Sequence, residues 1–187
     1  AFAWNGEQQE NFNIYVKPIG AGRLQRLTSH PGNDHWPAWS PDGRSIAFLR
    51  EIPTPGTATN SDPKLAVILI PALGGPERKL GEIPAYESSI LNWSPDGKWL
   101  VLSDRASEKE GSGIFLLSPD SGEKRRLTDC PPSLLGDYCP ALSRDGRALV
   151  FVRWIGPDSG DLYTMPLSKE LVPQGPPEGL ASNFAWV

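Results

Sequence analysis

The sequence predicts an all-β fold in which a four-stranded unit is repeated four times. Three segments carry the same type of turn: Ser40-Pro41-Asp42-Gly43, Ser94-Pro95-Asp96-Gly97 and Ser143-Arg144-Asp145-Gly146. Their serines are 54 and 49 residues apart, and an apolar run follows each turn. A period of about 50 residues is typical of propeller blades rather than of helical solenoids. We therefore predict a β-propeller with four four-stranded blades in this chain.

The chemistry of the turn explains why it recurs. Proline presets φ at the first turn position, aspartate suits the second, and glycine adopts the left-handed conformation that closes a hairpin through a bulge. Each motif thus joins the first strand of a blade to the second. The aspartates are therefore interpreted as folding residues and not as catalytic ones: Asp42, Asp96 and Asp145.

Two further strands complete each repeat. Third strands are enriched in β-branched and aromatic residues, as strands are, and are expected at Asn13–Val16, Leu65–Ile68, Gly113–Leu116 and Asp161–Met165. Fourth strands are polar, which suits an exposed sheet edge, and are expected at Arg26–Thr28, Lys79–Gly81 and Arg126–Thr128. In the last repeat, prolines interrupt this strand.

The two ends of the chain match different strands of the repeat. Phe2 aligns with second strands, whereas Phe184-Ala185-Trp186 aligns with the first-strand segment Pro37-Ala38-Trp39. This predicts sixteen strands with one first strand displaced to the far end. The repeats then span approximately 1–45, 46–99, 100–148 and 149–187. A half-propeller, a fragment of a longer propeller and a head-to-tail homodimer that closes an eight-bladed ring all remain open.

The repeat resembles a known family. The Trp-Ser-Pro-Asp-Gly turns, the Ile14-Tyr15-Val16 strand and the Arg-Leu-Thr edge strands are similar to the TolB-like propeller repeat, a relative of the WD repeat. The resemblance covers essentially the whole chain, although Arg144 replaces the proline of the third turn. It implies a propeller fold but not one function, because functions are grafted on folds. The family includes a periplasmic protein-binding propeller, propellers fused to bacterial regulators, and the propeller of prolyl-oligopeptidase-type peptidases.

Composition excludes several classes of partner. The formal net charge is −4, with both signs interspersed, so the chain lacks the basic field that binds nucleic acid. No apolar run approaches the roughly 18–20 residues that span a bilayer, so we expect no membrane insertion by this segment. Glycine (19 residues) and proline (20 residues) are abundant, which indicates frequent turns between short strands.

A search for catalytic motifs finds none. The sequence lacks a Gly-x-Ser-x-Gly elbow and a phosphate-binding glycine loop. Both histidines, His30 and His35, are expected in a single loop. The nearest thing to a metal cluster is Asn33-Asp34-His35, a segment that is more often simply solvated. We predict no catalytic residue, no metal and no cofactor.

The two cysteines leave two alternatives. Cys130 and Cys139 flank a short loop before the third turn. A disulfide there is sterically allowed and would indicate an oxidising compartment. The alternative is two thiols, one of them at the start of a buried strand.

Topology indicates where a partner binds. In a blade, the connections after the second and fourth strands lie on one face of the ring, here called the long-loop face. These connections are expected to be long and irregular: 5–11, 51–62, 105–111, 154–160, 30–36, 82–88 and 129–138. Variable loops on a rigid scaffold commonly carry recognition. Aromatic and arginine residues among carboxylates suit a protein or peptide partner, and the predicted partner-binding residues are Trp4, Asp34, His35, Trp36, Arg50, Glu87, Asp104, Asp137, Tyr138, Arg153, Trp154 and Asn183.

Together these observations predict a non-catalytic scaffold or sensor domain that binds protein or peptide and belongs to a larger bacterial protein. The alternative is the substrate-gating propeller of a prolyl-oligopeptidase-type serine peptidase whose catalytic domain lies outside this segment. The resemblance favours a periplasmic or otherwise extracytoplasmic location.

Overall fold

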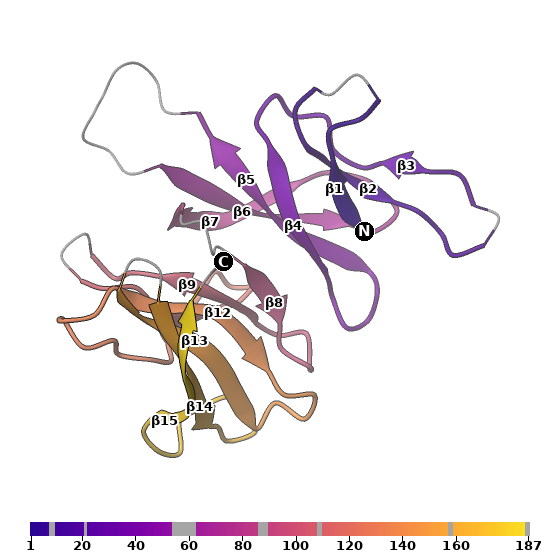
Figure 1. Ribbon diagram of the computed structural model, residues 1–187. Coiled ribbons are helices and arrows are strands. Elements are labelled where there is room, and N and C mark those ends of the chain that lie inside the picture. The colour runs from indigo at the N-terminus through magenta and orange to yellow at the C-terminus, as the bar shows by residue number, and fades with distance from the viewer. Residues whose placement is uncertain are drawn as a thin grey trace. The chain divides into compact units, whose positions relative to one another are not determined.

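A computed structural model describes residues 1–7, 10–20, 22–53, 63–85, 90–107, 110–156 and 159–185. Within these ranges the chain is all-β, with fifteen strands in four antiparallel sheets (Figure 1). One sheet has three strands and the other three have four. The chain divides into two compact units, Ala1–Ala85 and Tyr86–Val187, and each unit contains two sheets. The prediction of an all-β chain of propeller blades is confirmed.

Unit 1 holds the first two blades. Blade 1 has the order β1-β2-β3 and blade 2 the order β4-β5-β6-β7, so strands that are consecutive in sequence are neighbours in the sheet. The strands are β1 (Phe2–Trp4), β2 (Asn13–Val16), β3 (Gln25–Arg26), β4 (Asp34–Trp39), β5 (Ser45–Ile52), β6 (Lys64–Pro71) and β7 (Arg78–Pro84).

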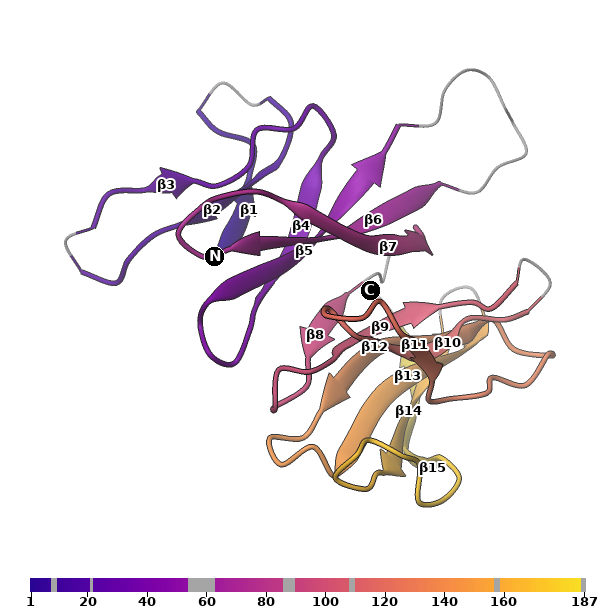
Figure 2. The same ribbon diagram turned by 180° about the vertical axis from the view of Figure 1, so that it is seen from behind.

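Unit 2 repeats this meander twice (Figure 2). Blade 3 has the order β8-β9-β10-β11 and blade 4 the order β12-β13-β14-β15. The strands are β8 (Leu91–Trp93), β9 (Leu100–Asp104), β10 (Gly113–Leu117), β11 (Lys124–Arg126), β12 (Gly136–Leu142), β13 (Ala148–Gly156), β14 (Ser159–Pro166) and β15 (Glu178–Ala185). All four predicted third strands are present, with bounds shifted by at most three residues.

The repeated turn is built as its chemistry predicts. In blade 2, the Ser40 hydroxyl donates to Asp42 Oδ1 at 2.6 Å and accepts from the Ser45 N–H, while Asp42 Oδ1 also accepts from the Arg44 N–H. The same bonds recur in the turns of blades 3 and 4. Gly43 has φ +70°, a left-handed conformation that favours glycine. The motif therefore serves to close the hairpin.

The Arg-Leu-Thr segments also have a structural role. The hydroxyl of Thr28 accepts from the Ile14 N–H at 2.9 Å, and Thr128 does the same for Ile114. The arginine two residues earlier donates to the carbonyl of its threonine in both blades. These side chains continue the pairing of the third strand beyond the point where the short fourth strand ends.

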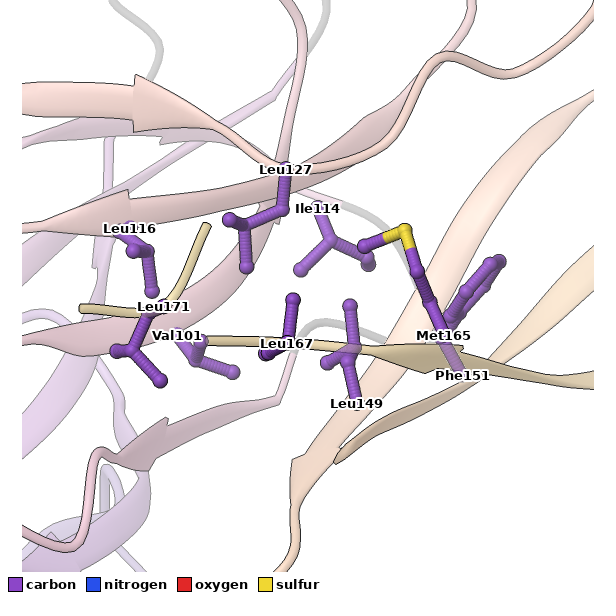
Figure 3. Close-up of a cluster of buried hydrophobic side chains, with 9 residues drawn as sticks. All are labelled: Val101, Ile114, Leu116, Leu127, Leu149, Phe151, Met165, Leu167 and Leu171. Atoms are coloured by element: carbon purple, nitrogen blue, oxygen red, sulfur yellow. The ribbon is translucent and has the colours of Figure 1, made fainter. Parts of the chain in front are cut away.

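Each unit has its own apolar core between its two blades. In unit 1, Ile14 of blade 1 packs against a cluster from blade 2 that includes Phe48 and Ile68. In unit 2, residues from blades 3 and 4 and from the segment after β14 converge (Figure 3): Val101, Ile114, Leu116, Leu127, Leu149, Phe151, Met165, Leu167 and Leu171. Alternating residues of the strands supply both cores, as the period of a pleated strand requires.

Two first strands begin earlier than the sequence predicts. Asp34 to Trp36 belong to β4, and the equivalent residues Asp137 to Cys139 belong to β12, rather than to links between blades. A β-bulge interrupts the pairing in both strands, and Trp36 (φ +50°) and Cys139 (φ +53°) adopt the left-handed conformation there. A bulge inserts an extra residue into one strand and disrupts the alternation of apolar residues. That alternation is the pattern by which strands are recognised.

Two expectations for blade 4 are wrong. The predicted loop 154–160 is largely strand, because β13 extends to Gly156 and β14 starts at Ser159. Phe184 and Ala185 end β15, which pairs with β14, instead of beginning a displaced first strand. In the described parts of blades 1 and 3, a link of several residues leads from the fourth strand to the next first strand. No such link separates Phe184 and Ala185 from the rest of β15, which is continuous from Glu178 to Ala185, so both residues belong to the fourth strand of blade 4.

Candidate functional site

Equivalent positions near the ends of the second strands carry charged side chains in blades 2, 3 and 4. Arg50, Asp104 and Arg153 each lie ten residues after the turn serine. Arg50 makes two hydrogen bonds to Asp34, Nε to Oδ1 at 2.6 Å and Nη2 to Oδ2 at 2.9 Å. Arg153 repeats this geometry on Asp137, at 2.7 and 2.9 Å. Both carboxylates are fully buried, so the two ion pairs are built into the blades.

Arg50 also binds a second carboxylate. Its Nη1 and Nη2 donate to Glu77 at 2.5 and 3.0 Å, and its guanidinium lies 5.3 Å from the centre of the Phe48 ring. Burial alone would lower the pKa of the Arg50 guanidinium, but its hydrogen bonds to Asp34 and Glu77 outweigh burial and raise that pKa above its ordinary value. Arg50 is therefore committed to contacts inside its own blade.

Blade 3 reverses the sign of this arrangement. Asp104 stands at the position of Arg50 and forms an ion pair with Lys124. Lys124 is equivalent to Glu77. Lys79 pairs with Ile68 in blade 2, and Arg126 pairs with Phe115, the equivalent of Ile68, in blade 3. Glu77 and Lys124 each lie two residues before these fourth-strand residues. Blades 2 and 3 thus have an ion pair at the same two positions, but the strand that carries the cation in blade 2 carries the carboxylate in blade 3.

Blade 1 fills the same positions with apolar groups. Trp4 and Leu24 line an open pocket of about 330 Å³ with Tyr15, whose ring meets the Trp4 ring edge-on at 5.1 Å. A second pocket, of about 350 Å³, occupies the equivalent place in blade 2, where Arg50 and Glu77 replace Trp4 and Leu24. The two blades of unit 1 are therefore hollowed at the same place in their sheets.

Aromatic side chains accompany these charges in both units. In unit 1, His35 lies between Phe12 and Trp36, with ring centres 5.0 Å apart on each side. In unit 2, the Tyr138 ring meets the Trp154 ring edge-on at 6.1 Å. His35 and Tyr138 are equivalent residues of β4 and β12. The long-loop face of each unit thus carries a cluster of aromatic rings.

The predicted site residues consequently fall into two groups. The structure places Asp34, Arg50, Asp104, Asp137 and Arg153 in buried ion pairs. His35, Trp36, Trp154 and Trp4 retain exposed surface, and Tyr138 is nearly buried. Glu87 lies outside the described residues, and Asn183 is known only as a backbone position of β15.

Cys130 and Cys139 carry thiols in the structure and not a disulfide. Partial burial raises the pKa of the Cys130 thiol, and the nearby Asp137 carboxylate adds to this rise. A raised pKa disfavours the thiolate, which is the reactive form. Cys130 thus has no sign of nucleophilic activation.

Sequence reasoning missed Phe12, Glu51, Glu77 and Lys124 as members of these clusters. Glu77 lies one residue before β7, and Lys124 is the first residue of β11. Polar residues are common at the edges of sheets, so neither residue stands out in the sequence. Phe12 and Glu51 become notable only through the pairing of distant segments. A comparison of repeats position by position, counted from the turn serine, would have found Glu51.

The described residues contain no group of three His, Cys, Asp or Glu side chains that could hold a metal. They also contain no helix long and apolar enough to cross a membrane. What the arrangement offers is aromatic rings, satisfied ion pairs and two open pockets, which are features of a recognition surface.

Comparison with known structures decides the fold. A TolB protein from Acinetobacter baumannii superposes with a TM-score of 0.69 at 18% identity, covering 92% of this chain and 38% of that protein. The chain has the fold of a TolB-like β-propeller. A prolyl endopeptidase superposes on this TolB-like segment with a TM-score of 0.67 at 16% identity, covering 94% of it and 27% of the peptidase. The predicted resemblance is confirmed, and the chain is a partial propeller with four blades.

No protein-family model matches the sequence. A curated relative of the TolB-like segment is the uncharacterized peptidase YuxL of Bacillus subtilis, 30% identical over 173 residues. The match covers 74% of this chain but 24% of the relative. The chain therefore spans about a quarter of the length of this relative.

Proposed function

We propose that this TolB-like segment is a non-catalytic propeller module that binds protein or peptide partners through its long-loop face. The observation that carries the proposal is the pair of aromatic clusters at equivalent positions, Phe12–His35–Trp36 in unit 1 and Tyr138–Trp154 in unit 2. Aromatic residues are enriched at protein interfaces and dominate their energetics. The resemblance to TolB proteins supports an extracytoplasmic location for this binding.

Buried ion pairs hold together the strands that carry the aromatic clusters. Asp34 and Arg50 fix the start of β4 against the end of β5, and Asp137 and Arg153 do the same for β12 and β13. His35 and Tyr138 each follow the buried aspartate directly. A rigid support lowers the entropy that a binding residue loses when its partner docks. In this proposal the arginines act as positioning residues, and the rings that retain exposed surface, Phe12, Trp36 and Trp154, make the contacts, with Tyr138 packed behind Trp154.

Site-specific photocrosslinking tests the proposal in the full-length protein in its host. A benzophenone amino acid replaces Trp36 or Trp154, and matched probes replace Arg44 or Lys98 in the Ser-Pro-Asp-Gly turns at the opposite ends of the blades. We expect a defined protein adduct from positions 36 and 154 and none from positions 44 and 98. Equal labelling from both sets of positions would count against the long-loop face.

The second candidate is the substrate-gating propeller of a serine peptidase. The specific observation that favours it is the 30% identity to a protein named as a peptidase. The two functions differ in what the complete gene product contains. A hydrolase domain with a Gly-x-Ser-x-Gly elbow, together with cleavage of blocked peptide substrates that is lost when the elbow serine is replaced by alanine, would establish the peptidase context.

A further inference from the structure

The aromatic cluster of unit 1 is exposed, although its rings are large and apolar. Phe12 and Trp36 are each 37% exposed, and His35 lies between them. Trp36 holds φ +50°, a conformation that bulky residues rarely adopt. Such strain persists where the surrounding structure fixes it, and it is commonly found at functional sites.

Hydrogen bonds hold the platform in place. The Phe12 N–H donates to Asn33 Oδ1 at 2.9 Å, and the Phe12 carbonyl accepts from the Asp34 N–H at 2.9 Å. The Asn11 amide also donates to the His30 carbonyl at 2.6 Å. The connection before β2 is thereby fastened to the link before β4. Phe12 and Trp36 are therefore fixed relative to one another before any ligand arrives.

Glu51 supplies a carboxylate at the edge of this platform. Its Oε2 accepts from the Asn33 amide at 2.7 Å, and its Oε1 lies 3.4 Å from His35 Nε2. Its side chain is 49% exposed. Among the described residues Glu51 has no lysine or arginine partner, whereas Asp34 and Glu77 share Arg50. A negative charge beside three aromatic rings is thus oriented but not neutralised by a permanent cation.

Glu51 also borders a pocket. Glu51 lines the 350 Å³ pocket of blade 2, whose wall includes the apolar side chains of Ala66 and Ile68. The other charged groups of this lining are already engaged: Arg50 with Glu77, and Lys79 with Glu82 at 2.6 Å. Glu51 therefore links an aromatic platform on one side to an open pocket on the other.

We propose that Glu51, together with the Phe12–His35–Trp36 platform, receives a lysine or arginine side chain of the partner. A cation near an aromatic face is attracted by the ring quadrupole, and a carboxylate within reach adds a charge-assisted hydrogen bond. The alkyl stem of such a side chain can lie on the rings while its head reaches Glu51. This inference rests on the proposed function and names the ligand chemistry of one part of that face.

Unit 2 provides an internal comparison. Eleven residues after the turn serine, Trp154 occupies the position of Glu51, and Cys139 occupies the position of Trp36. The Tyr138–Trp154 pair therefore has aromatic rings but not the equivalent carboxylate. The two units are expected to prefer different side chains, with the cation preference confined to unit 1.

Nuclear magnetic resonance of the tryptophan indoles can test this inference on the whole chain. Each of the seven tryptophans carries one indole N–H, and the signal that is missing in the Trp36→Phe variant is that of Trp36. The probes are two blocked tripeptides, acetyl-Gly-Arg-Gly-amide and acetyl-Gly-Gln-Gly-amide, titrated at constant ionic strength. We expect the arginine peptide to shift the Trp36 signal saturably and the glutamine peptide to leave it in place.

Variants separate the charge from the rings. Glu51→Gln keeps the shape of the side chain and should weaken binding of the arginine peptide roughly five-fold, as the loss of one surface charge contact predicts. Glu123→Gln removes an exposed carboxylate from unit 2 and should not change it. Equal shifts with both peptides, or unchanged affinity in Glu51→Gln, would overturn the inference. If the peptides move only the Trp154 signal, this inference fails while the proposed function of the long-loop face stands.

Discussion

Asp104 lies in blade 3 where Arg50 lies in blade 2, and its ion pair with Lys124 has the opposite polarity to the pair of Arg50 with Glu77. Where these two positions carry charges, as in blades 2 and 3, the fold accepts either orientation of the pair. Because Asp104 is buried and Lys124 is partly exposed, the carboxylate depends on its partner more than the ammonium does.

The interaction between Asp104 and Lys124 can be tested by exchanging the charges of the two residues. Asp104→Asn should lower the free energy of unfolding by about 1–3 kcal/mol, since a buried carboxylate and its bond to Lys124 are lost. The double variant Asp104→Arg with Lys124→Glu gives blade 3 the polarity of the Arg50–Glu77 pair of blade 2. Urea denaturation should show that it is more stable than the sum of the two single changes predicts, by about 1 kcal/mol or more. Strict additivity would mean that the two side chains do not interact.

The Asp137–Arg153 pair should be the most sensitive charge contact of unit 2. Arg153→Ala leaves the fully buried Asp137 without its guanidinium, which is expected to cost about 3–5 kcal/mol. The matched control is Arg44→Ala, whose ion pair with Asp42 is 3.9 Å long and exposed, and whose loss should change stability by less than about 1 kcal/mol. Thermal unfolding of the two variants measures the difference, and similar losses would refute a buried role for Arg153.

Replacing the turn glycine Gly43 by alanine should lower the stability because of the backbone conformation and not because of a steric clash. A Cβ added at Gly43 would meet nothing within 4 Å, so the cost of Gly43→Ala comes from φ +70° and should be about 1–2 kcal/mol. Gly81 in β7 is equally open but does not have a positive φ. Gly81→Ala should therefore leave the urea midpoint unchanged or raise it. A loss of stability in both variants would point to a steric cause.

These turns were predictable from the sequence because their bonds join residues at most five positions apart. The bulges at Trp36 and Cys139 were not, since a bulge removes the alternation that marks a strand. The Asp34–Arg50 pair joins residues sixteen apart whose register depends on the whole hairpin. The sequence therefore identified these residues as neighbours on one face but not as partners, and Phe12 escaped notice because its neighbours come from other strands.

The same turns should make stability depend on pH in acid. Hydrogen bonds from Ser40 and Ser143 hold the pKa values of Asp42 and Asp145 below the ordinary 3.8. A lowered folded-state pKa means that the unfolded chain binds protons first as the pH falls. The stabilisation is therefore present above about pH 4 and lost below it.

Urea midpoints measured from about pH 6 to about pH 3 can check this dependence. The double variant Asp42→Asn with Asp145→Asn should lose less stability over that range than the wild type, because two of the titrating groups are gone. Other carboxyl groups with lowered pKa values, at Glu82, Glu110 and Glu170, should keep some of the slope. An identical pH profile for both proteins would contradict the assignment to the turns.

Blade 1 presents a face that should dock another blade. Phe2 (40% exposed) and Leu24 (41% exposed) flank Tyr15 on it. The equivalent face of blade 2, with Phe48 and Ile68, is packed against Ile14 of blade 1. A second copy of the chain can supply the complementary surface through the partly exposed pair Val152 and Leu162 of blade 4, whose positions are equivalent to Ala3 and Ile14.

Light scattering across a dilution series is therefore expected to give a mass of about twice 20.4 kDa for the isolated chain, as a head-to-tail dimer requires. Leu24→Lys places a charge on the docking face and should shift the mass toward the monomer. Leu73→Lys is the matched control, because Leu73 is 89% exposed in the turn after β6 and should leave the dimer intact. A monomer at every concentration, with both variants unchanged, would mean that the face of blade 1 is not covered by a second copy, and would direct the search for its occupant to other segments of the full-length protein.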